Sequence, residues 1–100
     1  MKRVMLLEKL RNQAPQIRAI CTQYGASHPR VFGSVARGEE RPDSDVDMLV
    51  DLPRGYDLFA QRLPLQERLE QIAGRSLDLI PEHELNPHIR ASVLREAVSL

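Results

Sequence analysis

Residues 45–52 constrain the fold more than any other part of this sequence. Apolar side chains recur there at every second position, at Val46, Met48 and Val50. A period of two is the pattern of a β-strand, because successive side chains of a strand point to opposite faces of the sheet. The segment therefore predicts a strand with one apolar face and with two carboxylates, Asp45 and Asp47, on the other.

Two shorter apolar runs predict further strands. One is Arg30-Val31-Phe32, which ends at Gly33, and the other is 77–80, which stops at Pro81. Short apolar runs bounded by glycine or proline are typical of strands buried in a sheet. The sequence therefore predicts a sheet of about three strands.

Apolar residues spaced three and four apart predict helices around this sheet. The first pair spans about 2–13 and 15–24, either as two helices or as one helix kinked at Pro15, which lacks an amide donor. The remaining helices are predicted at about 57–62, at 64–73 and from an Asn86 cap onwards. This alternation of helices and strands predicts an α/β (α+β) fold, in which a small mixed sheet is flanked by helices.

The length and composition of the chain fit one small folded domain, residues 1–100, with 42% apolar and 28% charged residues. Such a domain hides a modest core, so we expect self-association or a protein partner. The net charge is zero, which argues against generic nucleic-acid binding. Cys21, the single cysteine, permits no internal disulfide and fits a reducing cytoplasm. The apolar run near the start is too short for a secretion signal or membrane span, so a cytoplasmic protein is expected.

Gly33 and Ser34 form a candidate anion-binding turn directly after the first predicted strand. Glycine lets the backbone approach a ligand closely, and a strand that turns into a helix presents free amides to an anion. The alternative is an ordinary turn, because a glycine-serine pair alone is weak evidence.

Asp45 and Asp47 form a candidate metal site. Residues two apart on a strand share a face and lie roughly 6–7 Å from one another. Neighbouring carboxylates repel and stay ionised most easily beside a cation, and hard oxygen ligands suit Mg²⁺. The alternative is a strand surface that simply faces water.

Asp78 is the third candidate, because it interrupts the apolar strand 77–80, where a charge is costly unless it is paired or binds a metal. If this strand lies beside 45–52, Asp78 joins Asp45 and Asp47 on one face. Three carboxylates and a phosphate-binding turn are what a two-metal phosphoryl-transfer site needs.

Gly33-Ser34, ten intervening residues and then Asp45-Val46-Asp47 match the nucleotidyltransferase signature of the DNA polymerase beta superfamily. The fuller runs 32–38 and 43–50 resemble the minimal nucleotidyltransferases, the MNT antitoxins of HEPN–MNT toxin–antitoxin pairs. The similarity extends over nearly the whole chain and includes the strand with Asp78 and the closing segment 94–98.

The resemblance implies a nucleotidyltransferase fold and an enzyme that uses ATP with Mg²⁺, two ions being expected. It implies transfer of AMP to a hydroxyl, for which we expect a tyrosine, of a cognate HEPN toxin, which is thereby neutralised. Asp45, Asp47 and Asp78 would be the catalytic and metal-binding residues, and Gly33 and Ser34 would bind the nucleotide. Arg37 would also bind phosphate, or else form a salt bridge with Glu39 or Asp43.

Two other functions remain open at this point. The chain could be an antitoxin that neutralises by binding alone, or it could transfer a nucleotide to RNA or a small molecule. Docking of a partner toxin could use the apolar residues Tyr56, Leu58 and Phe59, which follow the acidic strand, or these side chains could pack beneath the sheet.

Overall fold

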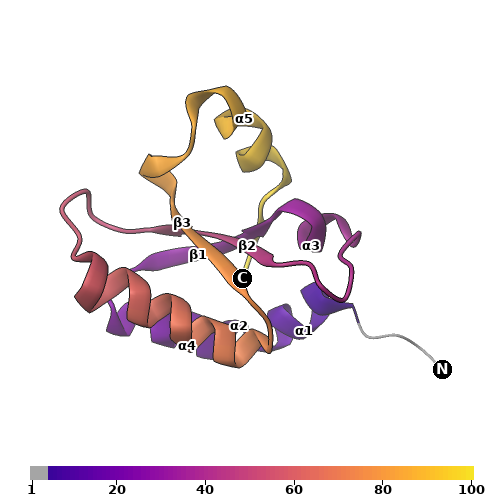
Figure 1. Cartoon of the computed structure of the whole chain (residues 1–100), viewed down its shortest axis with the longest axis horizontal. Coiled ribbons are helices and arrows are strands. Elements are labelled where there is room, and N and C mark those ends of the chain that lie inside the picture. Colours follow the sequence, from indigo (N-terminus) through magenta and orange to yellow (C-terminus); the bar gives the residue numbers. More distant parts are fainter. Residues whose placement is uncertain (1–4) are drawn as a thin grey trace.

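Four strands form one mixed sheet in the order β3-β2-β1-β4 in the computed structural model, which describes residues 5–100 (Figure 1). The strands are β1 (Ser27–Phe32), β2 (Val46–Asp51), β3 (Leu77–Pro81) and β4 (Val98–Ser99). β1 runs antiparallel to both β2 and β4, whereas β2 and β3 are parallel. The predicted α/β class and mixed sheet are confirmed, and the short β4 is an additional strand, because two residues carry no periodicity.

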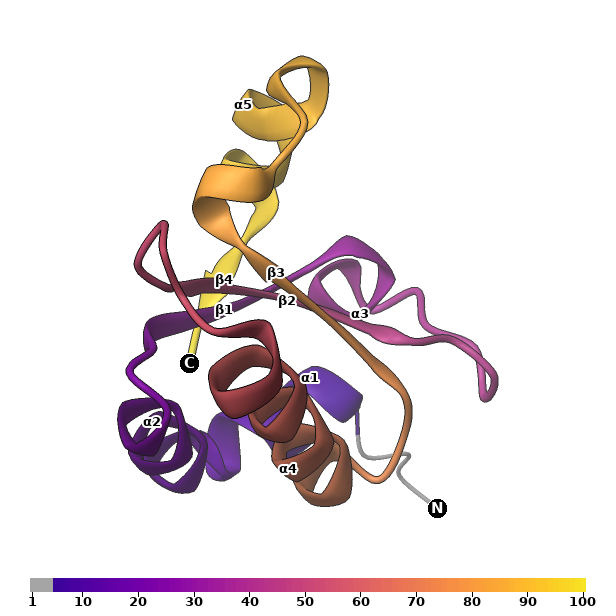
Figure 2. The same ribbon diagram turned by 60° about the vertical axis from the view of Figure 1, so that its left-hand side comes forward.

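Three helices cover one face of this sheet (Figure 2): α1 (Leu6–Asn12), α2 (Ala14–Gln23) and α4 (Leu63–Ala73). Pro15 lies in the first turn of α2, where its missing amide donor costs nothing, so the chain forms two helices rather than one kinked helix. Residues 2–4 of the first predicted helix lie outside the described residues. Within residues 5–100, none of the helices has the length and hydrophobicity that a membrane crossing requires.

The larger apolar core lies between these helices and the sheet. Val46, Met48 and Val50 are all buried there, as their alternation predicts. Cys21 also belongs to this core, and burial raises the pKa of its thiol to about 11. A thiol with that pKa is a structural side chain and not a nucleophile at neutral pH.

The other face of the sheet is covered sparsely, by α5 (Pro87–Glu96), while α3 (Gly33–Arg37) lies at the end of β1 and buries Val35 in the larger core (Figure 1). A small cluster of Phe32, Leu49, Leu85 and Val93 attaches α5 to the sheet. Asn86 accepts a hydrogen bond from the amide of His88 and caps α5, as predicted. This face therefore keeps room for polar side chains on β2 and β3.

The link between β2 and α4 includes a one-turn π-helix, η1 (Leu58–Arg62), and a 3₁₀ turn, η2 (Glu82–Glu84), follows β3. Asp57 caps η1 by accepting from the amides of Phe59 and Ala60. Both short elements lie beyond the carboxyl ends of β2 and β3, since the hydroxyl of Tyr56 donates to Glu84.

Candidate active site

The three candidate carboxylates lie together at the amino ends of β2 and β3. Asp47 and Asp78 are direct partners in the parallel register of these strands, and Asp45 comes two residues before Asp47. Direct partners share a face of the sheet, and neighbouring strands lie about 4.8 Å apart. The structure thus brings the three acids to the face opposite α2 and α4, and the predicted neighbourhood of the second and third strands is confirmed.

Asp47 is the electrostatic centre of this group. Its pKa is raised above the ordinary value, first by burial and then by the negative charges of Asp78 and Asp45, while Arg37 acts in the opposite direction. A carboxylate held among like charges is stabilised by a cation. Oxygen donors of this kind are the ligands that Mg²⁺ prefers.

The fit to a divalent cation depends on donor type and charge. Within residues 5–100, no three carboxylate, imidazole or thiol groups converge closely enough to form a complete metal-binding cluster. Mg²⁺ usually keeps several waters and takes only one or two protein carboxylates together with substrate phosphates. The residues present are therefore chemically suited to Mg²⁺ that is shared with a phosphate ligand.

Gly33 brings the candidate anion-binding turn into contact with Asp47. It follows Phe32, the register partner of Asp47, and it has a positive φ of 73°. A Cβ atom at this position would collide with the Asp47 carboxylate, so a side chain here would be both strained and obstructed. Glycine is required here, because the backbone of the turn touches the acidic strand.

The short helix α3 starts directly at the end of β1 and ends at Gly38, which adopts the left-handed conformation. The first amides of a helix lack intrahelical acceptors. In α3 these amides belong to Gly33, Ser34 and Val35; the Gly33 amide donates to Glu96, and Ser34 is half-buried. The amides of Ser34 and Val35 are thus candidate donors, directly after the glycine that contacts Asp47.

Arg37 lies at the other end of α3 and makes two ion pairs. Its Nε donates to Glu39 at 2.9 Å, and its Nη1 donates to Glu96 at 3.0 Å. The salt bridge to Glu39 that the sequence suggested is therefore formed, and the proximity of Arg37 to Asp47 leaves the phosphate role open as well.

Glu96 is the residue near the site that sequence reasoning missed. It accepts from the amide of Gly33 at 2.7 Å, although 63 positions separate the two residues. The one signal in the sequence is that Glu96 belongs to the closing segment 94–98, which carries part of the family resemblance.

The apolar residues proposed for docking lie far from the acids. Tyr56 bonds to Glu84 and Arg62 beyond the carboxyl ends of the strands, whereas the acids occupy the amino ends (Figure 1). These residues therefore lie at the opposite end of β2 from the acids, and their use in docking a partner stays a prediction. Packing beneath the sheet is wrong for Phe59, whose exposed fraction is 79%, and for Leu58.

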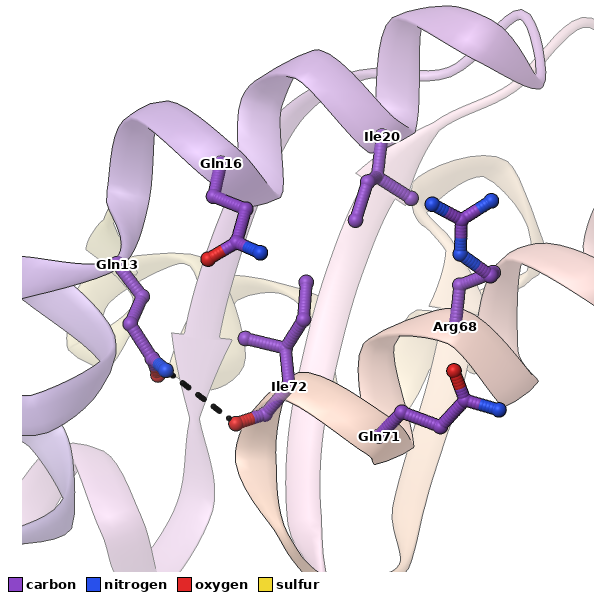
Figure 3. Close-up of a pocket in the computed structure, with 6 residues that line it drawn as sticks. All are labelled: Gln13, Gln16, Ile20, Arg68, Gln71 and Ile72. Carbon is purple, nitrogen blue, oxygen red and sulfur yellow. Dashed lines mark hydrogen bonds between the residues drawn. The ribbon is translucent and has the colours of Figure 1, made fainter.

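A separate groove lies between α2 and α4 on the helical face (Figure 3). Its cavity volume is about 410 Å³, and its lining consists of Gln13, Gln16, Ile20, Arg68, Gln71 and Ile72. The amide of Gln13 donates to the carbonyl of Ile72 at 3.4 Å across one end. The groove has no carboxylate and faces away from the acids, so it is not the candidate active site.

Comparisons with known proteins agree with this geometry. A family model described as a nucleotidyltransferase domain matches residues 16–100. Protein adenylyltransferase MntA of Thermococcus cleftensis is 41% identical over 76% of this chain and 76% of that protein. A relative from Methanocaldococcus jannaschii, also assigned as a protein adenylyltransferase, is 31% identical over 81% of this chain and 86% of its own length.

Solved structures share the fold. A structure assigned as a minimal nucleotidyltransferase is 44% identical, with a TM-score of 0.81 over 94% of this chain and 95% of that one. A chain from a crystal structure of a toxin–antitoxin with AMP-PNP has a TM-score of 0.70 at 19% identity, over 86% of this chain and 70% of that one. Because the second chain is only 19% identical, that match shows a similarity of fold alone.

A mixed sheet with acids on two parallel strands, next to a glycine-serine turn, defines a nucleotidyltransferase. The chain belongs to the nucleotidyltransferase domain family, and its resemblance to the minimal nucleotidyltransferases is confirmed.

Proposed function

We propose that this protein transfers AMP from ATP to a tyrosine hydroxyl of a HEPN-type toxin and thereby neutralises it. The observation that carries the proposal is the contact between the Gly33 turn and Asp47, with Asp78 as the register partner of Asp47. Relatives named as protein adenylyltransferases support the reaction. The fold neighbour from a toxin–antitoxin structure with AMP-PNP supports the choice of partner and nucleotide.

In this proposal the acids hold the metal ions. Asp45 and Asp47 would bind Mg²⁺, two ions being shared among the three carboxylates and the triphosphate. When bound, the ions neutralise phosphate charge and make the acceptor hydroxyl more acidic. The Asp47 carboxylate is suited to this task because its negative neighbours raise its pKa and a cation removes that penalty.

The anion-binding residues hold the triphosphate. The amides of Ser34 and Val35 and the Ser34 hydroxyl would donate to phosphate oxygens, and Arg37 would offset their charge, while the Gly33 amide stays bonded to Glu96. This arrangement would bring the α-phosphorus beside the acids, since Gly33 touches Asp47. The reaction then needs an acceptor oxygen held in line with the leaving pyrophosphate.

Asp78 is suited to the acceptor side. It lies on β3, an edge strand of the sheet, and its side chain is exposed. The tyrosine oxygen forms a bond to the α-phosphorus, the bond to pyrophosphate breaks, and the hydroxyl proton passes to the Asp78 carboxylate. A partner that approaches from the β3 edge would deliver its hydroxyl to this carboxylate.

The test is the mass of the partner after incubation. The protein, a HEPN-type toxin, ATP and Mg²⁺ are combined, and the toxin is analysed by mass spectrometry. We expect one or more adenylate additions on tyrosine, absent with Asp47→Asn and retained with Asp43→Asn. Asp43 is a matched control because it is exposed in the loop just before the site. A tight complex without any mass change would contradict the proposal and favour neutralisation by binding alone.

A further inference from the structure

We propose that Glu96 is a positioning residue of the nucleotide site, which acts by holding Gly33 and Arg37 in place. This inference rests on the proposed function, since it concerns the turn and the arginine assigned there to phosphate binding.

One carboxylate bridges the two ends of α3. Oε1 of Glu96 accepts from the Gly33 amide at 2.7 Å, and Oε2 accepts from Nη1 of Arg37 at 3.0 Å. Gly33 is the first residue of α3 and Arg37 is the last. The Glu96 side chain thus fixes the start of the turn, which touches Asp47, relative to the guanidinium at its end.

The sheet holds Glu96 in this position. Glu96 ends α5, and β4 begins two residues later, where Val98 pairs with Val31 of β1 (Figure 2). Val31 lies two residues before Gly33, so the β1–β4 pairing delivers Glu96 to the start of α3. The Glu96 side chain is 29% exposed, whereas the Glu39 side chain is 62% exposed. Water and salt therefore screen the Arg37–Glu96 ion pair less than the Arg37–Glu39 pair.

Arg37 has two acidic partners in different directions. Glu39 is exposed and lies just beyond α3, whereas Glu96 lies next to Gly33 at the acidic site. Without the charge of Glu96, Arg37 keeps only the exposed partner, and its guanidinium is free to move away from the site. Ordering a long side chain anew on ligand binding weakens affinity by roughly 2- to 10-fold.

Glu96 differs from the three aspartates in its bonding. Both of its oxygens accept from groups of α3, and Arg37 offsets much of its charge, the rest of which adds slightly to the raised pKa of Asp47. Its role is therefore to position other groups and not to bind a metal. Its loss would affect ATP binding rather than the chemical step.

The variant Glu96→Gln separates the two contacts. The glutamine oxygen can still accept from the Gly33 amide, but the attraction for Arg37 is lost. We expect the KM and the Kd for ATP with Mg²⁺ to rise roughly 2- to 10-fold. We expect kcat to stay within about 2-fold, because an interaction made equally in the ground and transition states affects KM alone. Glu39→Gln is the matched control and should have a smaller effect.

A double-mutant cycle tests the mechanism. In the background Arg37→Gln, the additional change Glu96→Gln should alter the Kd for ATP no further, because Glu96 acts through Arg37. An equal loss in both backgrounds would overturn the inference, as would an unchanged or lower Kd in Glu96→Gln alone. If Glu96→Gln does not fold, as judged by thermal unfolding, Glu96→Asp replaces it, since the shorter carboxylate cannot reach both donors.

The wild-type protein separates this inference from the proposed function. Absence of ATP binding and transfer in the wild type would refute the proposed function and this inference with it. An active wild type with unchanged Glu96→Gln kinetics would refute the role of Glu96 alone.

Discussion

The strand β2 carries acids at both of its ends, and the two ends have opposite electrostatics. At the carboxyl end, Arg30 is only 5% exposed and donates to Asp51 and Glu82, each at 2.7 Å. Glu82 also pairs with Arg90, and these arginines, Arg30 first, lower its pKa. At the amino end, burial and the charges of Asp78 and Asp45 raise the pKa of Asp47 instead.

The difference shows which charges stabilise the fold and which do not. The network around Arg30 joins β1, β2 and η2 with opposite charges, so it contributes to stability. The acids at the amino end repel one another and weaken the fold slightly. Charged residues that destabilise the fold by mutual repulsion are expected at functional sites.

Asp47→Asn should have the largest effect on activity. Loss of a metal ligand should lower kcat/KM for AMP transfer by roughly 10³-fold or more, since several kcal/mol of transition-state stabilisation disappear. The thermal midpoint should not fall, because the change removes a repelled charge. Measurement of transfer and of thermal unfolding on the same preparation checks both, and full activity in this variant would remove Asp47 from the site.

Arg30→Met should have the opposite profile. It leaves Asp51 and Glu82 without their shared cation, and we expect a loss of about 2–3 kcal/mol in the free energy of unfolding. This is less than for a wholly buried pair, because the Asp51 side chain is 46% exposed. Urea unfolding measures the loss, and ATP binding by the folded fraction should be unchanged. A stability equal to that of the wild type would mean that the network is only superficial.

Ser34→Ala should weaken the use of ATP by roughly 10- to 100-fold, the scale of one or two charge-assisted hydrogen bonds. Ser34 is half-buried and directly follows Gly33, which contacts Asp47. Steady-state kinetics in ATP measures the effect, and Ser44→Ala is a matched control, because the Ser44 hydroxyl accepts from the amide of Arg41 within the loop. Unchanged kinetics in Ser34→Ala would show that its hydroxyl does not touch the triphosphate.

The pH dependence of stability should differ in sign between the amino end of β2, where Asp47 lies, and the carboxyl end, where Glu82 lies. The expected effect is small. Asp47 has a folded-state pKa above its ordinary value of 3.8, so its destabilising charge is lost as the pH falls through that folded value. Glu82 has a folded-state pKa below its ordinary value of 4.5, so its contribution is complete above 4.5 and is lost as the pH falls further.

Unfolding titrations from pH 7 to pH 3 test this contrast. The stability gain of Asp47→Asn over the wild type should be present at pH 7 and should vanish below 3.8, where both states are neutral. The stability loss of Glu82→Gln should also be present at pH 7 and should shrink below 4.5. If Asp47→Asn and Glu82→Gln changed the free energy of unfolding in the same direction at pH 7, the comparison would be contradicted.

The sequence predicts those parts of the site that depend on local periodicity. The alternation around Asp47, the acid within strand 77–80 and the glycine-serine turn each depend on neighbouring residues alone. Register then brings Asp78 opposite Asp47. The fold class follows for the same reason, because its main helices and strands are long enough to show a period.

Other features depend on distant parts of the chain and could not be predicted in this way. The bond from Gly33 to Glu96 needs the β1–β4 pairing, and β4 is too short for a pattern. Burial of Arg30 follows from two partners that come from β2 and η2. The exposure of Phe59 results from the η1 turn, since a large aromatic residue is normally assigned to the core.

The most direct test of the central claim is the free energy of unfolding with and without ATP and Mg²⁺. If the acids at the amino end of β2 bind the metal and nucleotide, a ligand at 100 times its Kd should stabilise the wild type by roughly 2.7 kcal/mol. Chelation of the metal, or the variant Asp47→Asn, should abolish this gain, whereas Asp43→Asn should retain it. An equal gain in Asp47→Asn and in the wild type would contradict the account.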